Sequence, residues 1–205
     1  VLLFFDMTKY FQKKMQKRCV FLYIYIFFRT FVPYFYKMAG IYIHIPFCKR
    51  KCYYCDFKSF ANKEMYVDSY INALCKEIEK YNYLNDEYEI TSIYLGGGTP
   101  SHIDSKNIVK VLNIIRENYT VNKNAEITLE INPGTVDKEK LQSYYNAGIN
   151  RISFGLQSTN DGMLKRIGRI HSYNEFVENY KCWAFCSYAI FNRSSELYGT
   201  VIDNV

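Results

Sequence analysis

The sequence has no long basic stretch, no apolar run of membrane length and no residue order typical of a cleavable signal peptide. The formal net charge of the 205 residues is only +6 and the lysines and arginines are scattered, which disfavours a nucleic-acid-binding face. The apolar run over residues 20–28 is too short to span a bilayer, and a longer run would include Arg29 and Pro33. We therefore expect no nucleic-acid partner, no membrane anchor and a cytoplasmic protein.

Cysteine is present, but not in a pattern that suggests disulfides. The seven cysteines are an odd number with uneven spacing, so a reduced compartment with thiolates free to bind a metal fits them better. Cys48, Cys52 and Cys55 are concentrated in one C-x₃-C-x₂-C loop. The remaining four are interpreted as non-ligands, and they are Cys19, Cys75, Cys182 and Cys186.

Two segments differ in composition. Residues 1–37 are rich in Phe and Tyr and poor in acids, whereas Met38 opens directly onto a well-patterned strand. We expect residues 1–37 to be non-native or disordered upstream sequence with no role in the fold. Residues 38–205 are expected to form one domain, with a pattern that degrades after about residue 180.

Within this domain, short β-branched runs alternate with longer helical patterns, which is typical of βα units around a parallel sheet. The predicted strands are residues 41–45, 91–95, 126–131 and 151–155, and the predicted helices are residues 64–83, 105–118, 137–146 and 174–185. Asp137 is a candidate N-cap, and Gly148 follows that helix as a C′ residue would. The prediction is an α/β fold, a half or three-quarter (β/α) barrel.

The βα loops of such a fold gather at the carboxyl ends of the strands, where ligands bind. The cysteine loop follows the first predicted strand, and GGGTP at residues 96–100 follows the second. Glu130 ends the third strand and Gln157 ends the fourth. We therefore expect these groups to meet in one site.

Three thiolates leave one iron of a cubane cluster open to a ligand that is not cysteine. A structural zinc site is the alternative, but zinc would need a fourth nearby Cys or His. His44 lies within the preceding strand and Cys75 lies on a helix, so the cluster is favoured.

The motifs together resemble the radical S-adenosylmethionine (SAM) family. YIHIPFC at residues 42–48 running into CYYCDF at residues 52–57 resembles the oxygen-independent coproporphyrinogen III oxidase branch, which includes haem chaperones. GGGTP, Glu130 before Asn-Pro, and FGLQS at residues 154–158 follow in family order. The resemblance covers roughly residues 39–175 and implies a partial radical SAM (β/α) barrel, truncated at the C-terminus. It further implies a [4Fe-4S] cluster whose electron cleaves SAM to a 5′-deoxyadenosyl radical.

The same resemblance implies a ligand set for this chain. Cys48, Cys52 and Cys55 would hold the cluster, and the SAM contacts would be Tyr42, Tyr54, Gly97, Gly98, Thr99, Glu130, Gln157 and Arg169. Glycines let the backbone approach a ligand, Glu130 can accept from a cationic group, and Arg169 can meet a carboxylate as a planar fork. Two alternatives stay open: Tyr42 as ordinary strand packing, and the glycines as a tight turn.

Phe57 distinguishes two functions within the branch. Oxidases that decarboxylate coproporphyrinogen III carry a further cysteine at this position, so Phe57 favours a haem chaperone and leaves enzymatic activity open. The implied partners are haem or porphyrin, haem-acceptor proteins, and an electron donor such as flavodoxin or ferredoxin. Family members continue into a strand that ends in an acidic residue, and Glu196 matches that residue only imperfectly. A third alternative is that the chain is a non-functional gene fragment.

Overall fold

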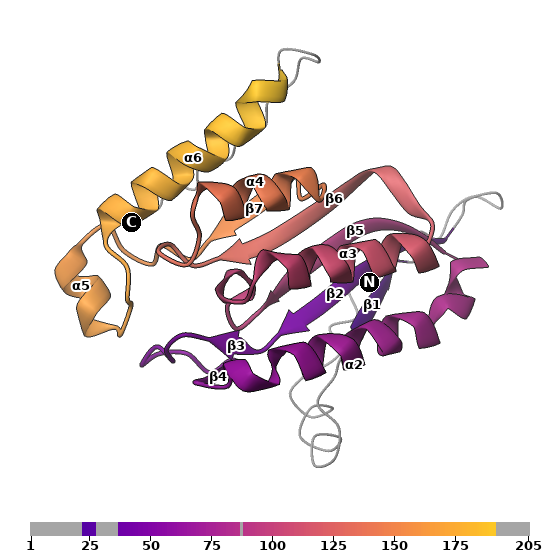
Figure 1. The fold of residues 1–205 in the computed structure, drawn as a ribbon, viewed down its shortest axis with the longest axis horizontal. Coiled ribbons are helices and arrows are strands. Elements are labelled where there is room, and N and C mark those ends of the chain that lie inside the picture. The colour runs from indigo at the N-terminus through magenta and orange to yellow at the C-terminus, as the bar shows by residue number, and fades with distance from the viewer. Residues whose placement is uncertain (1–21, 28–36, 87, 192–205) are drawn as a thin grey trace.

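The computed structural model describes residues 22–27, 37–86 and 88–191, and its centre is a five-stranded sheet (Figure 1). The strand order is β1-β2-β5-β6-β7. Their bounds are β1 Leu22–Phe27, β2 Lys37–Ile45, β5 Tyr88–Gly97, β6 Val121–Ile131 and β7 Arg151–Phe154. Strands β2, β5, β6 and β7 are parallel neighbours, whereas β1 is antiparallel to β2. This is the predicted α/β fold.

Three helices connect the parallel strands and cover one face of the sheet (Figure 1). These are α2 Val67–Lys80, α3 Ser105–Asn118 and α4 Lys138–Asn146, and α5 Asp161–Arg166 and α6 Tyr173–Phe191 follow β7. The short elements are β3 Phe47–Cys48, β4 Phe60–Ala61 and the 3₁₀ turns Glu64–Tyr66, Asn82–Asp86 and Pro100–His102. All four predicted strands and all four predicted helices are confirmed. Strands β2, β5 and β6 and helix α6 are longer than predicted, β7, α2 and α4 are shorter, and α3 has the predicted bounds, whereas α5 was not predicted.

Side chains alternate between the two faces of the sheet and so separate the core from the site. Ile43, Leu95 and Leu129 are fully buried between the sheet and the helices. Their neighbours along the strands point to the opposite face, where Tyr94 and Glu130 are half-buried. The face opposite these three helices therefore carries Tyr94 and Glu130.

The predicted helix caps are confirmed. Asp137 accepts a hydrogen bond from the Lys140 backbone N–H at 2.7 Å and begins α4. Gly148 follows α4 with φ of +85°, a left-handed conformation that favours glycine. A Cβ at this position would lie 2.6 Å from Nη2 of Arg116, which donates to the Ala147 carbonyl, so the end of that side chain would have to move.

Strand β1 corrects one expectation. Residues 1–37 were expected to have no role in the fold, yet Leu22–Phe27 pairs along its whole length with β2, from Leu22 opposite Ile43 to Phe27 opposite Met38. An alternating aromatic and β-branched run pairs readily with an open sheet edge, which explains the difference. Residues 1–21 and 28–36 lie outside the described part of the chain. No helix in the described ranges is long and apolar enough to cross a bilayer.

Candidate functional site

A cavity of about 230 Å³ lies at the carboxyl ends of the parallel strands. Every predicted site residue except Tyr42 lines it: Cys48, Cys52, Cys55, Tyr54, Gly97, Gly98, Thr99, Glu130, Gln157 and Arg169. These residues come from four different βα loops, which a parallel sheet brings to the same edge. The structure thus assembles in one place the groups that the sequence distributes over more than one hundred residues.

The three cysteines border this cavity with unequal burial. Cys48 is buried, Cys52 and Cys55 are half-buried, and all three are free thiols. Within the described residues, no group of three or more Cys, His, Asp or Glu side chains is placed to hold one metal ion.

Two side chains donate hydrogen bonds to the cysteine sulfurs. The Thr99 hydroxyl lies 3.4 Å from Sγ of Cys48, and Nη1 of Arg169 lies 3.7 Å from Sγ of Cys52. Donors of this kind stabilise negative charge on sulfur. The surroundings of both sulfurs therefore fit thiolate ligands.

The glycine loop packs against the end of β2. The Gly98 N–H donates to the Ile45 carbonyl at 2.9 Å, and the Thr99 N–H donates to the Phe47 carbonyl at 2.8 Å. Gly97 has φ of +113°, and a Cβ there would lie 2.6 Å from the ring of His44. The protein's own close backbone approach therefore requires these glycines, in addition to any approach of a ligand.

Glu130 is held by two donors from β5. The Tyr94 hydroxyl donates to Oε1 at 2.7 Å, and the Gly97 N–H donates to Oε2 at 3.1 Å. Burial, reinforced by the carboxylate, raises the pKa of Tyr94 well above its ordinary value, so the phenol remains a donor. Glu130 is thus a fixed acceptor at the cavity wall with lone pairs left for a cationic group.

Tyr42 has a different environment from the other predicted contacts. Its ring stacks on Tyr94 at a centroid distance of 6.0 Å, and its hydroxyl lies 3.1 Å from Nδ1 of His44. His44 Nε2 lies 2.8 Å from the Lys58 carbonyl and must donate to it, so Nδ1 accepts from Tyr42. Burial lowers the pKa of His44, which favours this neutral form. The structure supports the strand-packing alternative for Tyr42, and its contact with a ligand stays a prediction.

Arg169 is buried, with 8% of its surface exposed, and its guanidinium is largely engaged. Besides its contact with Cys52, Nη2 donates to Oδ1 of Asn132 at 2.5 Å and to the Gly155 carbonyl. Its Nε–H is buried without a partner. A buried unpaired donor on a cavity-lining residue fits an acceptor supplied by a bound ligand.

Gln157 also borders the cavity, and its backbone is in the left-handed conformation with φ of +69°. Backbone strain of this kind in a residue other than glycine is typical of functional sites.

Several residues that line the cavity were not among the predicted site residues. Asn132 is the most consequential, and its signal was its place two residues after Glu130. Phe57 also lines the cavity, so the position where the oxidases carry a further cysteine does face the site. Cys75 lies in the core on α2 and Cys182 on α6, and neither borders the cavity.

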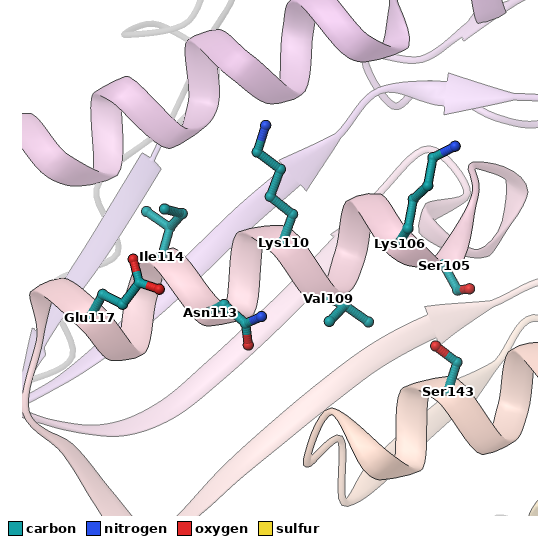
Figure 2. Close-up of a pocket in the computed structure, with 8 residues that line it drawn as sticks. All are labelled: Ser105, Lys106, Val109, Lys110, Asn113, Ile114, Glu117 and Ser143. Carbon is teal, nitrogen blue, oxygen red and sulfur yellow. The ribbon is translucent and has the colours of Figure 1, made fainter.

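A second hollow of about 520 Å³ lies on the helical layer (Figure 2). It is lined by Ser105, Lys106, Val109, Lys110, Asn113, Ile114, Glu117 and Ser143. Figure 2 shows Lys110 directed toward α2, where its Nζ donates to Asn72 at 2.7 Å. This groove is lined by residues of α3 and by Ser143 of α4 and holds no thiol or imidazole, so the cysteine cavity is the candidate site.

The sequence model of the Radical SAM superfamily matches residues 42–184. The chain is 43% identical over 139 residues to the haem chaperone HemW of Buchnera aphidicola subsp. Schizaphis graminum, covering 67% of this chain and 37% of that protein. It is 37% identical over 140 residues to a mitochondrial radical S-adenosyl methionine domain-containing protein 1 of Danio rerio, covering 68% and 32%.

The solved structure of the coproporphyrinogen III oxidase HemN from Escherichia coli, a radical SAM enzyme, is also similar. The TM-score is 0.68 at 27% identity, over 72% of this chain and 34% of that chain. The chain thus spans 32–37% of the length of these relatives.

Proposed function

Because the chain belongs to the radical SAM superfamily, we propose that it is the core of a HemW-like protein that binds one [4Fe-4S] cluster and S-adenosylmethionine and handles haem. The observation that carries this proposal is the cavity shared by the cysteine loop, the glycine loop and Glu130. The similarity to proteins named haem chaperone supports the choice of branch.

In this proposal, Cys48, Cys52 and Cys55 hold the cluster, which supplies the electron that cleaves S-adenosylmethionine. The protein's own residues bind and orient that ligand. Glu130, fixed by Tyr94 and Gly97, accepts from its cationic or hydroxyl groups. The unpaired Nε–H of Arg169 donates to its carboxylate.

Coproporphyrinogen oxidation is the second candidate, favoured by the similarity to HemN. Phe57 at the cavity wall disfavours it, because the side chain there has neither a thiol nor an exchangeable proton. The haem chaperone is therefore preferred. Haem-acceptor proteins and an electron donor such as flavodoxin or ferredoxin are the partners that this function implies.

Anaerobic reconstitution of the 205-residue chain with iron and sulfide tests the proposal. We expect a brown protein with about four irons per chain, as a cysteine-ligated cubane requires. Binding of haem without decarboxylation of coproporphyrinogen III would support the chaperone, whereas decarboxylation would favour the oxidase. A colourless protein that binds one zinc would contradict both.

A further inference from the structure

A continuous chain of hydrogen bonds joins two of the three cysteine sulfurs. The Thr99 hydroxyl donates to Sγ of Cys48 and accepts from Nδ2 of Asn132 at 2.8 Å. On its other side, Oδ1 of Asn132 accepts from Nη2 of Arg169, whose Nη1 donates to Sγ of Cys52. Asn132 is therefore the central link between the donors of both sulfurs.

The chemistry of the side chains fixes the direction of each bond. Arg169 can only donate, so the amide oxygen of Asn132 must face it and the amide nitrogen must face Thr99. Because that nitrogen donates to the Thr99 oxygen, the single hydroxyl proton of Thr99 remains available for Cys48. The amide of Asn132 can accept from Arg169 and donate to Thr99, whereas the carboxylate of an aspartate of the same length could only accept.

Two side-chain hydroxyls hold the backbone of Asn132 in place. The Asn132 N–H donates to Oγ of Ser101 at 3.2 Å, and the Asn132 carbonyl accepts from the Thr135 hydroxyl at 2.6 Å. Gly155 leaves the necessary space, because a Cβ there would lie 2.6 Å from Oδ1 of Asn132 and 3.0 Å from Nη2 of Arg169. A side chain at residue 155 would therefore disturb the contact between Asn132 and Arg169.

We propose that Asn132 is a positioning residue that holds both donors on the cysteine sulfurs and thereby raises the reduction potential of the cluster. This inference rests on the proposed function. Reduction adds negative charge to the cluster, and hydrogen bonds to its sulfurs stabilise the reduced form more than the oxidised form. Loss of Asn132 removes the donor to the Thr99 hydroxyl and one of the two acceptors of Arg169 Nη2, the other being the Gly155 carbonyl, so one substitution weakens the bonds to two ligands.

The test is a potentiometric titration of the reconstituted 205-residue chain without S-adenosylmethionine, followed by the EPR signal of the reduced cluster. Asn132→Leu should keep the iron content and lower the midpoint potential. A tenfold loss of relative stabilisation of the reduced form corresponds to about 59 mV for one electron. Thr99→Val should give a smaller shift, because it removes only the bond to Cys48.

The double variant separates a linked network from independent contacts. If Asn132 orients Thr99, adding Thr99→Val to Asn132→Leu should lower the potential no further. Asn179→Leu is the matched control, because Asn179 bridges the Gly134 N–H and the Val136 carbonyl and contacts no thiol. Its midpoint potential should equal that of the wild type.

Three outcomes would overturn the inference: an unchanged midpoint in Asn132→Leu, additive shifts in the double variant, or an equal shift in the Asn179 control. If Asn132→Leu fails to bind iron, Asn132→Asp retains the acceptor for Arg169, loses the donor to Thr99 and should also lower the potential. Loss of the cluster in both variants would assign Asn132 to assembly and also reject the inference. A wild-type chain that binds no cluster would instead refute the proposed function.

Discussion

Glu130→Gln provides the sharpest test of the S-adenosylmethionine site. Glutamine keeps the size of the side chain but loses the charge, and its amide replaces one carboxylate oxygen. Glu130 now accepts from Tyr94 at 2.7 Å and from Gly97 at 3.1 Å, and it has further lone pairs for a ligand. Glutamine has only one acceptor oxygen, so it can keep the hydrogen bond from Tyr94 or the one from Gly97, but not both. The charged acceptor for the ligand is lost in either case.

The expected magnitude follows from the bond that is lost. Removal of a charge-assisted hydrogen bond costs about 1.5–3 kcal/mol, which corresponds to roughly a ten- to a hundredfold loss of affinity. The assay is a titration of the reduced, reconstituted 205-residue chain with S-adenosylmethionine, followed by the change in the EPR spectrum. Iron content should not change, because Glu130 is not a proposed metal ligand.

Glu126→Gln is the matched control on the same strand. Glu126 pairs with Arg151 at 2.8 Å, and its side chain is 52% exposed and does not line the cavity. Its variant should bind S-adenosylmethionine as the wild type does. Equal affinities of the Glu130→Gln and wild-type proteins would refute the role of Glu130, and a wild-type spectrum indifferent to S-adenosylmethionine would refute the site.

Three further predictions concern the cluster, the glycine loop and pH. Cys52→Ala should abolish the cluster, whereas Cys75→Ala, in the core of α2, should retain it, as measured by iron and sulfide content. Gly97→Ala should lower the free energy of unfolding by at least about 1–3 kcal/mol in thermal denaturation, because φ is +113° and the new Cβ meets His44 at 2.6 Å. Gly162→Ala should cost less, because φ there is not positive and its one close neighbour is Oδ1 of the N-cap Asn160 at 3.0 Å. Burial lowers the pKa of His44 below its ordinary value of 6.5, so the folded state resists its protonation and stability should fall as pH drops below about 6.5. His44→Gln should flatten this dependence, and an unchanged slope would contradict the assignment.

The sequence by itself determined the regular elements and the location of the site. Apolar residues at strand and helix periods predicted the four βα units, and Asp137 and Gly148 marked the ends of α4. Parallel strands place their carboxyl ends at one edge, so the cysteine loop, the glycine loop and Glu130 could be assigned to one site. These features depend on local pattern and on a general rule of topology, and both can be read along the chain.

Only the tertiary structure decided which partner each side chain meets. Local pattern could not show that β1 pairs with β2, that Tyr42 stacks on Tyr94 outside the cavity, or that Asn132 contacts Arg169. The sequence predicted Arg169 as a fork for a carboxylate, whereas the fold engages it with protein acceptors and leaves one N–H unpaired. Such contacts join residues that are tens of positions apart, and the packing of whole elements sets their distances. Residue identity specifies which bonds a side chain can form, and the fold decides which of them form.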